Sequence, residues 1–228
     1  MATLVLVRHG RTTANATGVL AGRTPGVELD ETGTQQAGAA GRRLAGLALA
    51  EIVSSPLERC RQSATALLAQ QPSAGAQRVL VEDDLSECDY GEWQGRALSE
   101  LAQEPLWATV QTQPTAAVFP GGESMPAMQA RGVAAVRRHD ARITQASGPH
   151  AVWAAVSHGD VIKAILADAL GMHLDSFQRL DVHPASISIV HYGGPRPAVL
   201  GVNTLEGELG WLGRTPGETV GGGAGAAR

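Results

Sequence analysis

The chain has 228 residues, 43% of them hydrophobic and 18% charged, and a formal net charge of −4. A chain of this length buries a sizeable core, and its charge disfavours a nucleic-acid-binding surface, which needs a strongly basic face. No apolar run approaches the roughly 18 residues that span a bilayer, so no membrane association is expected.

Six short apolar runs have the character of buried strands: residues 3–7, 51–54, 78–82, 151–156, 187–192 and 198–202. Helical periodicity predicts four helices, over residues 32–49, 57–68, 124–145 and 160–170. In the last of these, Val161, Ile162 and Ile165 form one apolar stripe and Gly171 follows the end. Strands that alternate with helices over this length predict a layered α/β fold with a mostly parallel sheet.

No linker rich in Pro, Gly or Ser divides the chain, so residues 1–212 are predicted to form one domain. Residues 94–122 interrupt the alternation with three prolines and predict an irregular or helical insertion. The last residues, 213–228, are rich in Gly and Ala and are predicted to be disordered.

The two cysteines, Cys60 and Cys88, are too few for the disulfide framework of a secreted domain. The start of the chain lacks the basic segment and cleavage site of a signal peptide, so a cytoplasmic protein is expected. No CxxC or HExxH motif occurs, and neither a metal nor another cofactor is expected. We interpret both cysteines as small buried hydrophobic residues, with a redox-sensitive pair as the alternative.

Polar residues follow the predicted strands. Arg8 and His9 follow the first strand, Arg59 lies shortly after the second, Glu87 after the third and His158 after the fourth. Because ligands bind at the carboxyl ends of the strands in an open α/β sheet, these five side chains are expected at one rim.

These residue types suit the transfer of a phosphoryl group. Arginine forks and helix N-termini bind tetrahedral oxyanions. A histidine beside a bound phosphate can attack phosphorus, which splits one difficult displacement into two easier ones. A second histidine, if protonated, would stabilise charge on the transferring group. A carboxyl group with a raised pKa would protonate the leaving alcohol and then deprotonate the attacking water.

Ordered segments of the chain resemble the histidine phosphatase superfamily, the phosphoglycerate-mutase-like proteins. They are LVRHG (6–10), LDETG (29–33), SSPLERCRQSA (54–64), LSE (85–87), YGEWQG (90–95), PGGES (120–124) and VSHG (156–159). The resemblance spans roughly residues 3–203. It implies a three-layer α/β/α sandwich of phosphoglycerate-mutase-like fold, in which the insertion at 94–122 lies over the active site.

The resemblance also implies roles for the five residues at the predicted rim. His9 would be the phosphorylated nucleophile, and Glu87 would be the proton donor. Arg8, Arg59 and His158 would form the phosphate pocket.

Substrate contacts are implied for seven further residues: Gly10, Arg11, Asn15, Ala21, Gly22, Tyr90 and Gly159. Arg11 departs from the Glu or Gln most common after the RHG triplet. Arg23 and Arg96 are further candidates for the pocket entrance. Four other histidines are interpreted as structural or surface residues: His139, His150, His173 and His191. His183 is left without a role.

The segment around Glu87 contains other carboxylates. Glu92 is its chief rival as the acid, and the spacing of the LSE segment favours Glu87. Asp83, Asp84 and Asp89 crowd the same segment, and any of them that folded inward would help to raise the pKa of Glu87.

The charge of the chain after the segment that carries Glu87 distinguishes the branches of the superfamily. Mutases that resemble cofactor-dependent phosphoglycerate mutase carry extra basic residues there, whereas Arg96 is the only cation between Trp93 and Ala130. A neutral, partly apolar insertion suits a phosphatase with a less polar leaving group.

We therefore predict a metal-independent phosphomonoester hydrolase of the histidine acid phosphatase type, acting on a small phosphorylated metabolite. The alternatives are a mutase-type phosphoryl transferase and a non-catalytic phospholigand binder; a homodimer is compatible with the sequence.

Overall fold

A computed structural model describes residues 2–213 of the chain, so the predicted disordered tail lies outside the described residues except for Gly213. Six strands form one sheet: β1 (Thr3–Arg8), β2 (Ile52–Ser54), β3 (Val79–Val81), β4 (Val152–Ser157), β5 (Ile187–His191) and β6 (Ala198–Thr204). Their order in the sheet is β3-β2-β4-β1-β5-β6. The first four of these are parallel, and β5 and β6 are antiparallel additions at one edge. The predicted α/β fold with a mostly parallel sheet is confirmed.

Seven α-helices connect the strands: α1 (Thr13–Thr17), α2 (Glu31–Leu44), α3 (Glu58–Leu68), α4 (Leu98–Leu101), α5 (Pro105–Thr112), α6 (Met125–Ser147) and α7 (Gly159–Ala169). Five short 3₁₀ helices complete the described elements: η1 (Asp83–Leu85), η2 (Gly91–Trp93), η3 (Pro114–Ala116), η4 (Leu174–Arg179) and η5 (Gly210–Gly213).

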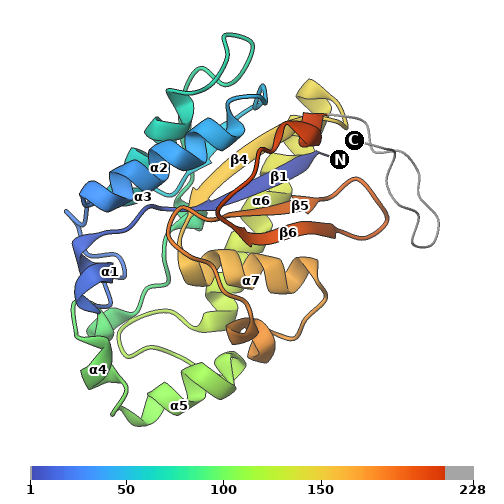
Figure 1. Cartoon of the computed structure of the whole chain (residues 1–228). Helices are drawn as coiled ribbons and strands as arrows, with labels where there is room; N and C mark the ends of the chain where they lie inside the picture. Colours follow the sequence, from blue (N-terminus) through green and yellow to red (C-terminus); the bar gives the residue numbers. More distant parts are fainter. Residues whose placement is uncertain (1, 214–228) are drawn as a thin grey trace.

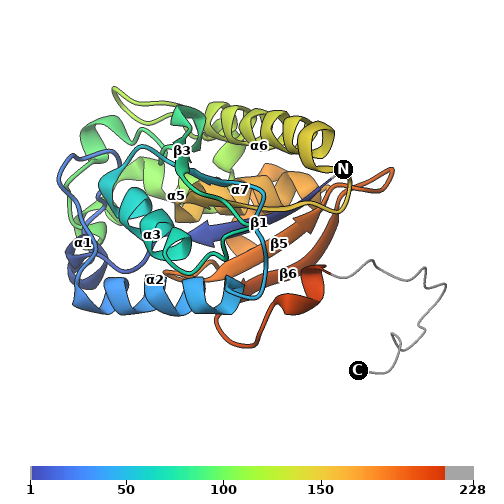
Figure 2. The same cartoon turned by 90° about the horizontal axis from the view of Figure 1, so that it is seen from above.

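The sheet is the middle layer of three. Helices α2 and α3 cover one face and α6 and α7 cover the other, as Figures 1 and 2 show from two directions. Alternate residues of β1 supply the two cores: Leu4 and Leu6 face α6 and α7, and Val5 and Val7 face α2 and α3. A strand that is apolar on both faces needs helices on both sides, which explains why its sequence is a continuous hydrophobic run.

The prediction was wrong about the end of α2. The helix was predicted to reach Leu49 but ends at Leu44, and Gly46 lies in the turn that follows. Leu47 and Leu49 are nevertheless buried in the same core as α2. Leu47 and Leu49 are therefore apolar because the loop after α2 is buried, and their spacing continues the helical pattern although the helix has ended.

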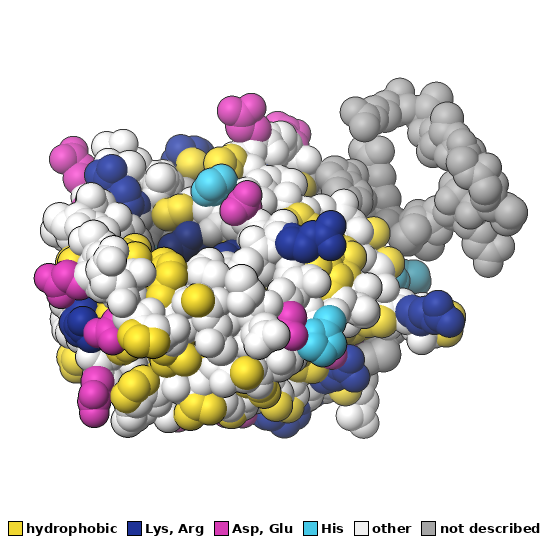
Figure 3. All heavy atoms as spheres, turned by 90° about the horizontal axis from the view of Figure 1, so that it is seen from below, with side chains coloured by type: hydrophobic (Ala, Val, Ile, Leu, Met, Phe, Trp, Pro, Cys, Tyr) yellow, Lys and Arg dark blue, Asp and Glu magenta, His cyan; other side chains and the backbone are white. Residues whose placement is uncertain are grey.

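The insertion at 94–122 was predicted to be irregular or helical. It is mostly helical and contains α4, α5 and η3. These elements lie at the end of the molecule where β1 and β4 finish (Figure 1). Within residues 2–213, no helix has both the length and the apolarity needed to cross a membrane. On the face shown in Figure 3, acidic and basic side chains are interspersed among hydrophobic ones.

Candidate active site

The carboxyl ends of three parallel strands meet at one point. Arg8 at the end of β1 is in register with Ser157 at the end of β4, and Ser54 at the end of β2 is in register with Val156. The next residues after β1 and β4 are histidines, His9 and His158, whose ring centroids are 5.2 Å apart. The topology thus brings together residues about 150 positions apart, as the strand-end argument predicted.

His9 has one ring nitrogen fixed and the other directed to the site. Its Nδ1 lies 2.7 Å from the Gly10 carbonyl oxygen, and Arg59 Nε donates to its Nε2 at 3.3 Å. Since a guanidinium only donates, Nε2 carries the lone pair and Nδ1 carries the proton. Burial, Arg59 and Arg8 together lower the pKa of His9 well below its usual value. The imidazole is therefore neutral, which is the form able to attack an electrophile.

Arg59 lies between the two histidines. Beyond its contact with His9, its Nη2 donates to the Gly22 carbonyl at 2.7 Å and to His158 Nδ1 at 3.2 Å. Arg59 is only 2% exposed, and its Nη1 has no hydrogen-bond partner among the described residues. A buried guanidinium nitrogen without a partner is costly unless a ligand accepts from it.

Arg8, like Arg59, donates to a backbone carbonyl and has a buried nitrogen without a partner in the described part of the chain. Its Nη1 donates to the Val182 carbonyl at 2.6 Å, while its buried Nε has no partner among the described residues. Gly159, the first residue of α7, lies against the same guanidinium, because a Cβ built on it would be 3.5 Å from Arg8 Cζ. The two arginines therefore offer unused donors to an oxyanion bound beside His9.

His158 is fully buried and does not line the cavity itself. Its Nε2 lies 2.8 Å from Ser55 Oγ, and its Nδ1 accepts from Arg59. Burial, followed by the charge of Arg59, lowers the pKa of His158 well below its usual value. In this structure it is a neutral residue that orients Arg59, whereas the charge stabilisation considered from the sequence requires the protonated form.

Glu87 lies beside His158 and lines the same cavity. Its Oε2 lies 4.0 Å from His158 Nδ1, and its Oε1 accepts from the Cys88 backbone N–H at 3.0 Å. Burial and then the charge of Asp160 raise the pKa of Glu87 to about 7. The neighbouring carboxylate is thus Asp160 on α7, and not any of the aspartates near Glu87 in the sequence. A carboxyl with this pKa can both give and take a proton near neutral pH.

Arg131 on α6 holds the loop that carries Glu87. It donates to the carbonyls of Asp84 and Ser86 at 2.7 Å each and to that of Glu87 at 3.0 Å, and it pairs with Glu123 at 2.6 Å. Sequence reasoning missed this residue, because an arginine on a helix resembles surface charge. A weak signal existed in Glu123, which lies in the PGGES segment.

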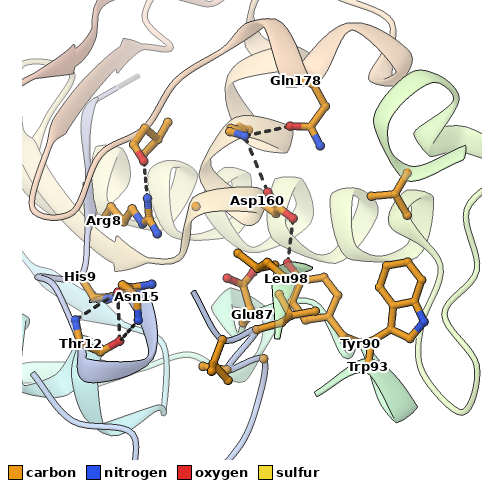
Figure 4. A pocket seen from close by; sticks show the side chains of 18 of the residues that line it. Arg8, His9, Thr12, Asn15, Glu87, Tyr90, Trp93, Leu98, Asp160 and Gln178 are labelled. Carbon is orange, nitrogen blue, oxygen red and sulfur yellow. Dashed lines mark hydrogen bonds and ion pairs between the residues drawn. The ribbon is translucent and has the colours of Figure 1, made fainter. Parts of the chain in front are cut away.

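A cavity of about 370 Å³ opens in front of His9. Figure 4 shows Arg8 and His9 on one side of it, Tyr90 and Trp93 on the other, and Glu87 between them. Five of the seven implied substrate contacts line the cavity: Asn15, Ala21, Gly22, Tyr90 and Gly159. Their roles remain predictions.

The other two implied contacts, Gly10 and Arg11, do not line the cavity. A Cβ at Gly10 would lie 2.3 Å from the Gly33 carbonyl oxygen, so this position serves the close packing of the loop on α2. Arg11 pairs instead with Asp30 at 2.7 Å and with Thr32 at 2.8 Å. These contacts place the Arg11 guanidinium at the start of α2.

The two entrance candidates are also engaged elsewhere. Arg23 donates to the Glu87 carbonyl at 2.8 Å and pairs with Glu123 at 2.9 Å, and Arg96 pairs with Glu104 at 2.7 Å. Neither lines the cavity, and Glu92, the rival acid, is exposed and outside it as well. The structure thus favours Glu87 over Glu92 by position.

Several lining residues come from α7 onward and were not predicted: Asp160, Lys163, Gln178, Asp181 and Val182. His183, for which the sequence indicates no role, lines the cavity too. Asp160 immediately follows His158 and Gly159, so the strand-end argument could have included it. Asp160 Oδ2 accepts from the Tyr90 hydroxyl at 2.7 Å (Figure 4).

Both cysteines are buried. Burial raises the pKa of Cys60 to about 12 and raises that of Cys88 as well. Since the thiolate is the reactive form, these values favour the interpretation as small hydrophobic residues over a redox-sensitive pair.

Comparison with known proteins gives a family match. A model of the histidine phosphatase superfamily (branch 1) matches residues 4–205. A bifunctional protein of Mycobacterium tuberculosis is 38% identical over 192 residues, which are 83% of this chain and 50% of that protein. The chain therefore spans about half the length of this relative.

Two further relatives are covered more fully. Glucosyl-3-phosphoglycerate phosphatase of Mycolicibacterium vanbaalenii is 32% identical over 76% of each chain. A probable phosphoglycerate mutase of Erwinia tasmaniensis is 30% identical over 84% of this chain and 86% of its own. The solved structure of mycobacterial glucosyl-3-phosphoglycerate phosphatase with VO3 has a TM-score of 0.77 at 28% identity, covering 88% of this chain and 98% of that one.

Proposed function

The chain belongs to the histidine phosphatase superfamily, and we propose that it is a phosphomonoesterase that works through a phosphohistidine at His9. The observation that carries this proposal is the position of His9 Nε2, which has its lone pair beside the two arginines with unused donors. Phosphatases among the relatives support the same reaction class.

In the first half of the reaction, the substrate phosphate accepts from Arg8 Nε and Arg59 Nη1. Arg59 Nε gives up its hydrogen bond to His9 Nε2. The freed lone pair attacks phosphorus in line with the ester oxygen, a P–N bond forms, and the P–O bond to the alcohol breaks. The Nδ1–H bond to the Gly10 carbonyl at 2.7 Å holds the ring and supports the positive charge it gains. Because the site is buried, water screens the charges of the phosphate and the two arginines less, which strengthens their hydrogen bonds.

Glu87 supplies and recovers the proton. With a pKa of about 7, its protonated form donates to the leaving oxygen and becomes a carboxylate. The carboxylate then takes a proton from a water molecule whose oxygen attacks the phosphohistidine. Inorganic phosphate leaves, and both His9 and Glu87 return to their starting forms. No step in this scheme requires a metal.

A panel of phosphomonoesters tests the proposal. We expect phosphate release by the wild-type chain, none by His9→Ala, and normal release by His150→Ala, which alters an exposed histidine. Vanadate should inhibit and EDTA should not. Activity that survives His9→Ala and disappears with EDTA would contradict the mechanism, and isomerisation of a phosphoglycerate faster than its hydrolysis would favour the mutase alternative.

A further inference from the structure

The cavity continues beyond the phosphate-binding end into a part that would receive the alcohol half of a substrate. One wall of this part is apolar and comes from the loop after α1, from η2 and from the insertion at 94–122. It includes Leu20, Trp93, Leu98, Trp107 and Phe119. The Trp93 and Trp107 rings are stacked, with centroids 6.3 Å apart and planes at 27°, and Phe119 packs edge-on against Trp93 at 5.3 Å. These aromatic rings offer apolar surface that can pack against a planar apolar group.

The part of the lining that comes from α7 and the segment after it contains the remaining charged side chains. Two are carboxylates, Asp160 and Asp181, and one is the ammonium of Lys163. Lys163 Nζ already donates to Gln178 Oε1 at 3.0 Å and lies 3.9 Å from Asp160 Oδ1. Asp181 is exposed, forms no ion pair with another described residue, and is part of the cavity lining. His183 is the other titratable lining group on this side.

We propose that the preferred substrates are phosphomonoesters of an uncharged alcohol with a planar apolar part, and that Asp181 and the tryptophan wall select them. This inference rests on the proposed function and names its substrate class. Arg8 and Arg59 are committed to the reacting phosphate, and Asp160 and Gln178 engage Lys163. A carboxylate or second phosphate on the alcohol would meet the charge of Asp181, while Lys163 is already shared between Gln178 and Asp160.

The physical basis is selection by attraction and by repulsion together. Contact with the tryptophan wall removes apolar surface from water on both sides. A like charge in a partly closed cavity disfavours an anionic competitor, which is how specific sites commonly reject near analogues. The relatives named for glucosyl-3-phosphoglycerate and phosphoglycerate would then differ from this chain in the charge of the alcohol that they accept.

Three substrates with similar primary-alcohol leaving groups isolate the two effects. We expect kcat/KM for benzyl phosphate to exceed that for 4-carboxybenzyl phosphate and that for glycerol 3-phosphate by roughly tenfold or more in each comparison. The first comparison adds a carboxylate to the same ring, and the second removes the planar apolar group.

Two variants assign the effects to residues. Asp181→Lys should raise kcat/KM for 4-carboxybenzyl phosphate relative to benzyl phosphate by roughly tenfold. Glu208→Lys, which changes an exposed carboxylate outside the cavity, should leave that ratio unchanged. Trp107→Ala should reduce the advantage of benzyl phosphate over glycerol 3-phosphate, and Trp107→Phe should preserve most of it.

The outcomes separate this inference from the proposed function. Equal or greater His9-dependent activity toward 4-carboxybenzyl or glycerol phosphate would overturn the substrate class while leaving the phosphatase proposal intact. An unchanged charge preference in Asp181→Lys would overturn the role of Asp181. If none of the three esters is hydrolysed, and no other phosphomonoester is, the proposed function itself fails.

Discussion

Arg59 Nε lies 3.3 Å from His9 Nε2, and the Nη2 of the same guanidinium lies 3.2 Å from His158 Nδ1. One side chain therefore fixes the tautomers of both histidines, because it can only donate to each of them. The Nη1 of the same side chain has no hydrogen-bond partner among the described residues. The planar fork thus performs three tasks that depend on its shape and on its charge together.

Arg59→Lys should therefore lower kcat/KM by about 100-fold or more, although it keeps the positive charge. An ammonium cannot contact His9, His158 and a phosphate from one plane, and loss of one preorganised donor typically costs about 3–4 kcal/mol. Steady-state kinetics measure the effect. Arg61→Lys, an exposed change on the same helix, is the matched control and should be near normal. Comparable turnover by both variants would mean that the reaction does not need the guanidinium fork of Arg59.

Glu87→Gln should make the folded chain more stable above neutral pH while lowering activity. Burial raises the pKa of Glu87 from 4.5 to about 7, so the unfolded chain ionises at lower pH than the folded one. Stability falls as pH rises through this window, and the cost of ionised Glu87 at pH 8 is about 3 kcal/mol. Glutamine avoids that cost.

Unfolding by denaturant at pH 5 and pH 8 checks this prediction. The stability gain of Glu87→Gln should be large at pH 8 and small at pH 5. Glu92→Gln, which alters the exposed rival, should show no such dependence. A gain that is the same at both values, or absent at pH 8, would mean that Glu87 is not held protonated by burial.

Asp160→Asn should shift the alkaline limb of the kcat/KM profile to lower pH, by roughly half a unit or more. The negative charge of Asp160 helps to raise the pKa of Glu87, so its loss lowers the pH at which Glu87 gives up its proton. The asparagine oxygen can still accept from the Tyr90 hydroxyl, which preserves the local contact. Asp168→Asn on the same helix controls for changes in α7. Superimposable profiles for Asp160→Asn and the wild type would contradict this role.

Much of the fold was predictable because its signals are local. The buried strands are continuous apolar runs, and the parallel order follows from alternation with helices. The position of the site also followed, since His9 and His158 each come directly after a buried strand. Leu47 and Leu49 show the limit of such signals, because burial of a loop and burial of a helix face produce the same apolar spacing.

Side-chain pairing explains what could not be predicted. Arg11, Arg23 and Arg96, unlike Arg8, have carboxylate partners, and those partners become neighbours through the fold. The carboxylate that acts on Glu87 likewise comes from α7, more than 70 residues away in sequence. Charge in a segment therefore indicated the chemistry of the site, but the tertiary contacts decided which charges remain available to a ligand.

Trapping of the phosphorylated chain tests the central claim most directly. A ³²P-labelled phosphomonoester is mixed with the wild-type chain, the reaction is quenched rapidly, and the label on the protein is characterised. We predict a phosphoenzyme that is labile in acid and stable in base, located by mass spectrometry on His9 and missing from His9→Ala. Steady hydrolysis with label on another residue, or with a phosphoenzyme that persists in His9→Ala, would contradict the account.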